Sequence, residues 1–133
     1  MIIFIKSLLS SMVFFSLIDL GWIKYVVQPM YKKHLSDYVA NSPNPGAALG
    51  FYFFFLAGLV YFVIQPAVEK GSITAAILPG AIYGLVTYAT YDLTAMAVLK
   101  NWPLVVTITD MAWGLFLAMS VAILSTWFVL KIS

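Results

Sequence analysis

Residues 87–103 read TYATYDLTAMAVLKNWP, and they place an aspartate, Asp92, in the middle of an otherwise membrane-like segment. Tyrosines and threonines flank the aspartate, and a lysine, a tryptophan and a proline follow it. A charged side chain inside a membrane helix costs about 2.5–3.5 kcal/mol on insertion scales. The surrounding fold must therefore give Asp92 a polar partner or a function.

The rest of the chain also has the composition of a membrane protein. Of its 133 residues, 63% are hydrophobic and only 9% are charged, and the mean hydropathy is +1.00. Soluble domains average about 25% charged residues. The formal net charge of +2 is small and the lysines are scattered, which argues against nucleic acid as a partner. Cysteine is absent, so disulfides and thiolate metal sites are excluded.

Four apolar stretches divide the chain. Each reaches the roughly 17–25 residues that a membrane-spanning helix needs. The first is too long for a signal peptide and lacks a small-x-small cleavage site, so we interpret it as a retained span. The prediction is an all-α fold, an integral membrane four-helix bundle that forms a single transmembrane domain over residues 1–133. The predicted spans cover about residues 2–27, 47–64, 73–97 and 104–130.

Turn-forming residues separate these stretches. The longest connection is predicted over residues 28–46, where NSPNPG is a strong helix breaker. Gln65 and Pro66 are expected to end the second span, and the polar EKG segment 69–71 is expected to turn the chain back. NWP, residues 101–103, separates the third span from the fourth.

The lysines do not decide which way the bundle faces in the membrane. With four spans both termini share one side, which carries three lysines, whereas the other side carries four. Such a balance gives no usable bias under the positive-inside rule. Two interpretations stay open: a single orientation set by other features, and dual insertion with an antiparallel homodimer.

Three aspartates lie inside the predicted spans, and counting along the chain brings them to one depth. Asp19, Asp92 and Asp110 lie nine, eight and seven residues from the loops at the same end of the bundle. At 1.5 Å per residue, each is roughly 10–14 Å from that membrane face. We therefore predict that carboxylates from three helices meet at one level, and we name these three residues the aspartate cluster.

Helical periodicity places further candidates around the aspartate cluster. Gly80, Gly84, Tyr88 and Asp92 are four residues apart and form one stripe along the third span. The two glycines permit close helix contact, so we predict a helix-packing role for them. The other residues predicted to bind a ligand or to couple to protons are Trp22, Tyr52, Tyr88, Tyr91, Lys100, Trp102 and Trp113.

Structural roles compete with these functional interpretations. The aspartates could form a hydrogen-bond network that ties the bundle together, although acids inside a membrane are candidates for function by default. The tryptophans could be ordinary interfacial aromatics. Three carboxylates suit a hard cation such as Mg²⁺, but nothing in their spacing demands one. The chain has one histidine, His34, and no phosphate cradle or Ser–His–Asp set, so we predict no metal and no cofactor.

Several short motifs together resemble a known family. They are DxxW at residues 19–22, FY at 51–52, TYDLT at 90–94, LKxWP at 99–103 and DxxWG at 110–114. They look like a family of small bacterial four-span membrane proteins, a domain of unknown function, over nearly the whole chain. An asparagine commonly follows TYDLT in that family, whereas Ala95 stands here. The resemblance implies a multi-pass protein of the bacterial inner membrane, and it implies no reaction.

Three functions stay open. The first is binding or proton-coupled transport of a small cationic or amphipathic molecule at the aspartate cluster, where aromatic walls add cation–π attraction. In size and span number the chain resembles the small multidrug-resistance transporters, but it lacks their lone glutamate in the first span. The second is a membrane enzyme acting on a lipid or isoprenoid, with one carboxyl group as the acid while another stays ionised. The third is an accessory or structural subunit. The lipid bilayer surrounds the protein in each case, and the ligand would be a small molecule or a lipid.

Overall fold

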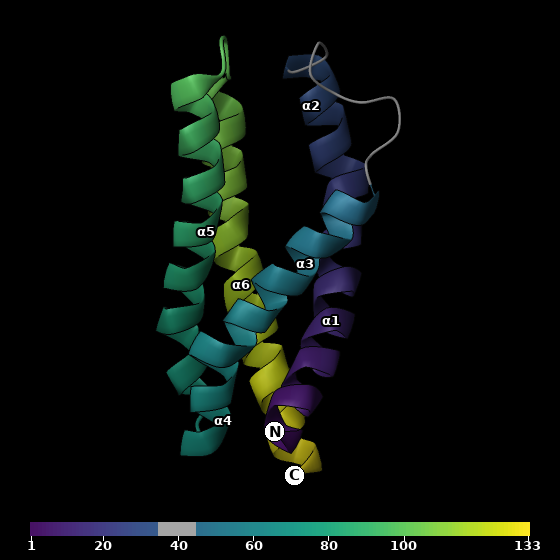
Figure 1. The fold of residues 1–133 in the computed structure, drawn as a ribbon, viewed down its shortest axis with the longest axis vertical. Helices are drawn as coiled ribbons and strands as arrows, with labels where there is room; N and C mark the ends of the chain where they lie inside the picture. The colour runs from purple at the N-terminus through teal and green to yellow at the C-terminus, as the bar shows by residue number, and fades with distance from the viewer. Residues whose placement is uncertain (35–44) are drawn as a thin grey trace.

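A computed structural model describes residues 1–34 and 45–133, and Figure 1 shows their arrangement. The described residues contain helices and no strand, which confirms the predicted fold class of a helical membrane bundle. The expected breaker NSPNPG lies mostly outside the described residues. In chain order the elements are α1 (Ile2–Trp22), η1 (Ile23–Val27), α2 (Gln28–His34), α3 (Pro45–Leu59), η2 (Val60–Ile64), α4 (Gln65–Lys70), η3 (Thr74–Ala76), α5 (Ile77–Val98) and α6 (Leu104–Ile132). Of these, η1 and η2 are π-helical turns and η3 is a 3-10 turn.

Two of the predicted helix ends are wrong. The chain does not enter a loop at Gln28, because α1, η1 and α2 form one continuous helical rod that ends at His34. It does not end its second span at Gln65 and Pro66 either, because α3, η2 and α4 form a rod that ends at Lys70. We name these the first rod and the second rod.

A π-helical turn before a proline explains both continuations. In the first rod the backbone N–H of Gln28 donates to the carbonyl of Ile23, five residues back, directly before Pro29. The second rod repeats this arrangement directly before Pro66, at η2. In a regular α-helix a proline ring clashes with the carbonyl four residues back. The wider turn relieves that clash, so each rod passes through a residue that would ordinarily break it.

Three segments of the described chain are long and apolar enough to cross a membrane: Ile2–His34, Pro45–Lys70 and Leu104–Ile132. The third predicted span corresponds to α5, which has 22 residues and is long enough. Its tyrosines, threonines and Asp92 lower its hydropathy below that of the other three. The crossing of the membrane by α5 stays a prediction.

The closest pairing of elements is between α5 and α6. A Cβ added at Gly84 would collide with the backbone carbonyl of Gly114 and with the Cβ of Ala118. A Cβ added at Gly80 would lie 3.1 Å from the Cβ of Ala122. The two helices therefore approach through small residues, as is common where helices pack inside membranes.

The apolar core lies toward the end of the bundle that holds both termini (Figure 1). It combines α1, the second rod and α6, and includes Phe15, Leu59, Ile64 and Leu117. The second rod crosses the bundle diagonally, and the beginning of its first part, α3, stands away from α5 and α6 in Figure 1. Further along α3, Phe55 accepts a hydrogen bond from the hydroxyl of Tyr83 on α5. At the end of the bundle opposite the termini, where α3 diverges from α5 and α6, the helices line a pocket.

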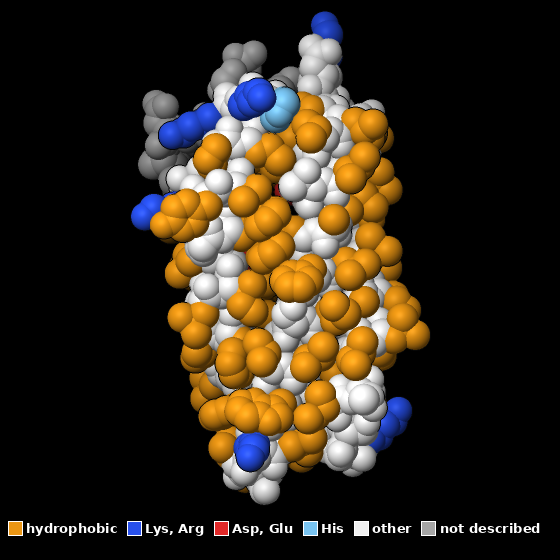
Figure 2. All heavy atoms as spheres, turned by 180° about the vertical axis from the view of Figure 1, so that it is seen from behind, with side chains coloured by type: hydrophobic (Ala, Val, Ile, Leu, Met, Phe, Trp, Pro, Cys, Tyr) orange, Lys and Arg blue, Asp and Glu red, His pale blue; other side chains and the backbone are white. Residues whose placement is uncertain are grey.

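The surface of the bundle suits a lipid environment. Figure 2 shows apolar side chains over the middle of one face and lysines at its two ends. Large exposed hydrophobic side chains occur on each long helix, for example Leu17, Phe54, Leu78 and Ile108. Hydrocarbon removes such apolar surface from water, which is favourable.

Candidate functional site

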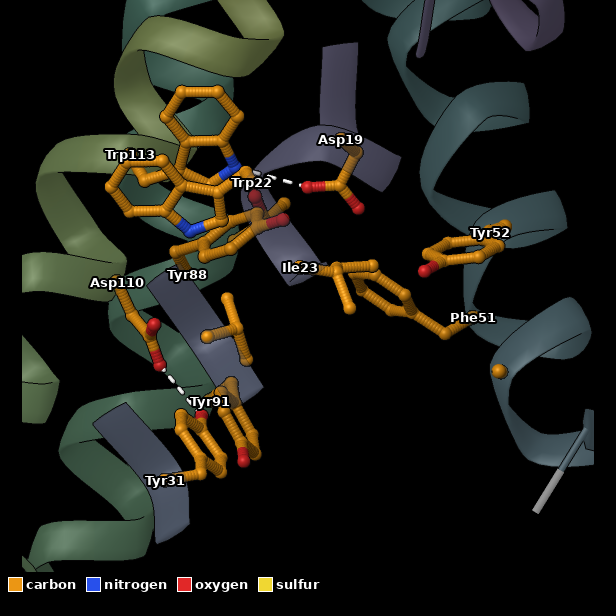
Figure 3. A pocket seen from close by; sticks show the side chains of 13 residues that line it. Asp19, Trp22, Ile23, Tyr31, Phe51, Tyr52, Tyr88, Tyr91, Asp110 and Trp113 are labelled. Carbon is orange, nitrogen blue, oxygen red and sulfur yellow. Dashed lines mark hydrogen bonds between the residues drawn. The ribbon is translucent and has the colours of Figure 1, made fainter. Parts of the chain in front are cut away.

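A pocket of about 430 Å³ lies between the first rod, α3 and the α5–α6 pair. Figure 3 shows mostly aromatic walls, with the carboxylates of Asp19 and Asp110 at separate places along them. The volume falls in the range of about 300–1,000 Å³ that is typical of small-molecule sites. The pocket is therefore the candidate functional site.

Asp19 enters the pocket from α1, near the end of that helix. Its side chain is only 6% exposed, and its Oδ1 accepts a hydrogen bond of 3.0 Å from the indole Nε1 of Trp113. The hydroxyl of Tyr52, on α3, is directed at the same carboxylate (Figure 3). The donors around Asp19 are thus neutral groups, from two different helices.

Two tryptophans form a flat wall beside Asp19. The rings of Trp22 and Trp113 stack with centroids 4.1 Å apart and an interplanar angle of 2°. Trp22 comes from α1 and Trp113 from α6, so the stack joins two helices. The indole N–H of Trp22 is buried and has no acceptor among the described residues. This wall offers a π surface close to a carboxylate.

Asp110 enters the pocket from α6 and is also 6% exposed. Its Oδ2 accepts a hydrogen bond of 2.9 Å from the hydroxyl of Tyr31. Tyr31 lies on α2, in a segment predicted from the sequence to be a loop, and for this reason it is not among the predicted site residues. The signal that could have found it is the spacing of Ile23, Val27 and Tyr31, which are four residues apart and all line the pocket.

Asp92 lies behind the pocket wall. It is fully buried, at 0% exposure, and neither carboxylate oxygen has a hydrogen-bond donor among the described residues. Its neighbour is Asp110, close enough for a hydrogen bond between the two carboxyl groups when one of them carries a proton. The aspartate cluster is therefore split into an Asp92–Asp110 pair and a separate Asp19.

Tyr88 and Tyr91 bring α5 to the pocket. Tyr88 packs against Gly114, where an added Cβ would collide with its ring, and its ring meets Phe55 edge-on at 6.0 Å between centroids. Tyr91 is 53% exposed and lies at the margin of the pocket. Glycine at position 114 thus lets the Tyr88 ring reach the space between the two carboxylates.

Lys100 and Trp102 do not line the pocket. Trp102 lies behind Tyr31 and Tyr91, whose rings it meets edge-on at 6.4 and 6.0 Å between centroids. Its indole Nε1 donates a 3.1 Å hydrogen bond to Thr107. Lys100 is exposed at the turn between α5 and α6. Trp102 therefore supports the two tyrosines from outside the site.

We searched the described part of the chain for side chains that could together bind a metal ion. The described His and acidic side chains do not form a group of three or more that could hold a metal ion. His34 is exposed at the end of α2. The site is therefore best described by its two pocket carboxylates and its aromatic walls.

The chain belongs to a family described as "Predicted membrane protein (DUF2177)", whose profile matches residues 4–127. This match confirms the family resemblance of the sequence and establishes a membrane protein. No curated protein and no solved structure shows significant similarity to the chain.

Proposed function

Taking membership of this family of membrane proteins as the premise, we propose that the pocket binds a small organic cation with an apolar body. One observation carries the proposal: the buried carboxylates of Asp19 and Asp110 line one aromatic pocket, and each accepts a hydrogen bond from an uncharged donor. An indole or phenol donor leaves the negative charge of a carboxylate uncompensated. A bound cation would compensate it, and the stacked tryptophans would add cation–π attraction of about 0.5–2 kcal/mol.

The proposal extends to the membrane arrangement. The four predicted spans, α5 included, cross the bacterial inner membrane, and the pocket lies within the depth of the bilayer. A carboxylate at that depth marks a pathway for ions, protons or substrates more often than a purely structural contact. Proton-coupled transport of the cation is the activity that such a site would support.

Binding of tetraphenylphosphonium, a lipophilic cation, to the purified protein in detergent tests the proposal. We expect saturable binding by calorimetry, with affinity at least about tenfold weaker in Asp19→Asn and in Asp110→Asn, because each change removes one charge from the pocket. Glu69→Gln is the matched control, since this carboxylate lies on α4 at the far end of the bundle. Failure of the wild-type protein to bind the cation, or equal affinities in all variants, would rule the proposal out.

A second function is favoured by the Asp92–Asp110 pair. Asp92 has no donor within residues 1–34 and 45–133, whereas Asp110 accepts from Tyr31. This asymmetry suits a general acid beside an ionised base. A membrane enzyme acting on a lipid or isoprenoid would use it. Deletion of the gene would then change the lipid profile, with restoration by wild type and not by Asp92→Asn. An unchanged lipid profile would exclude this function.

A further inference from the structure

Asp92 is a buried acid without the partners that an ionised carboxylate requires. Its side chain is 0% exposed and both oxygens lack a donor among the described residues. The titratable groups close enough to interact electrostatically with it are Asp110 from α6 and Tyr88 and Tyr91 from its own helix. Tyr31, from α2, faces Asp110 on the other side.

The physical cost of ionising both members of this pair is high. A buried carboxylate without hydrogen bonds or a countercharge is strongly destabilised relative to one in water. A second carboxylate beside it adds repulsion between like charges. A carboxylic acid at Asp92 removes both costs, because its O–H can donate to Asp110. Asp110 has the capacity to accept this bond in addition to the one from Tyr31.

We propose that Asp92 holds a proton which it donates in a hydrogen bond to Asp110, and that a cation bound in the pocket displaces this proton to solvent. The first half stands on the carboxyl pair alone, and the second half rests on the proposed function. In the exchange, the O–H bond of Asp92 breaks and its electron pair stays on the carboxylate oxygen. The proton passes by way of Asp110, which lines the pocket, to water. One positive charge leaves and one arrives, so the net charge of the site is conserved.

Infrared spectroscopy of the purified protein without any cation tests the first half. The carbonyl stretch of a protonated carboxyl group should be present in the wild type and lose intensity in Asp92→Asn. Asparagine keeps the shape of the side chain and an N–H that can donate to Asp110. Glu69→Gln, at the exposed far end, should leave the band unchanged. Equal bands in wild type and Asp92→Asn would overturn the inference.

Calorimetry of tetraphenylphosphonium binding in two buffers of different ionisation enthalpy tests the second half on the wild-type protein. We expect release of one proton per cation, so affinity should rise with pH by up to about tenfold per pH unit. In Asp92→Asn the affinity should be nearly independent of pH. Binding without proton release would overturn the exchange while leaving the proposed function intact. An absence of binding, with the infrared difference present, would refute the proposed function and uphold the shared proton.

Discussion

At the scale of single residues, the pocket carboxylates depend on donors that come from other helices. Asp110 on α6 accepts from Tyr31 on α2, and Asp19 on α1 accepts from Trp113 on α6. Each bond therefore joins two elements as well as satisfying a buried acceptor. An acceptor left unsatisfied in such a place costs about 1–3 kcal/mol.

Tyr31→Phe should lower the stability of the bundle by about 1–3 kcal/mol, because Asp110 loses a buried hydrogen bond and the phenyl ring remains. Thermal unfolding in detergent, followed by circular dichroism, measures the change. Tyr25→Phe is the matched control on the same rod, since Tyr25 is 73% exposed. Equal unfolding temperatures for the two variants would show that the Tyr31 hydroxyl contributes nothing.

At the scale of elements, glycines determine how α5 and α6 fit together. Gly84 meets backbone of the partner helix, which cannot move aside as a flexible side chain could. The same contact fixes the rotation of α5. That rotation decides which residues of the TYDLT segment face the pocket and which lie behind it.

Gly84→Ala should separate the two helices and reduce stability by about 1–3 kcal/mol through overpacking. Gly50→Ala provides the control, because a Cβ there meets nothing within 4 Å and Gly50 also lies within a helix. Chemical denaturation in detergent micelles gives the comparison. A Gly84→Ala protein as stable as Gly50→Ala would contradict the close packing of α5 against α6 at Gly84.

The helices were predictable from the sequence, whereas the course of the first rod and the position of Asp92 were not. Apolar runs and their lengths predicted the helical bundle, because hydrophobic length follows directly from residue order. The passage of the first rod through Pro29 was not predictable in this way, since a π-helical turn leaves no distinct pattern in hydropathy. Tyr31 was consequently missed. The place of Asp92 behind the wall depends on helix rotation, which counting of depth does not give.

At the scale of the whole molecule, the main prediction concerns how the four predicted spans are arranged in the membrane. Both termini and the α4 turn lie at one end, and the α5–α6 turn lies at the other (Figure 1). The lysines are divided almost evenly between the two ends predicted from the sequence. Charge alone therefore does not distinguish one orientation from a mixture of two.

Single cysteines can test this arrangement directly, because the chain contains no cysteine. Ser72→Cys and Asn101→Cys mark the two ends of α5 without changing the charge. We expect a membrane-impermeant maleimide to label one of them in intact cells and the other only after permeabilisation. Labelling of both from one side would mean that α5 does not cross, whereas partial labelling of each would indicate dual insertion.

The π-helical turn η1 determines how the residues of α2 are rotated about the axis of the first rod. If the same residues were wound as a regular α-helix, with no residue removed, α2 would be rotated by about 100° about the rod axis. The Tyr31 hydroxyl would then point away from Asp110. The widened turn thus works as a phase shift within a continuous rod, adjusting the angle at which the far end of the rod meets the site.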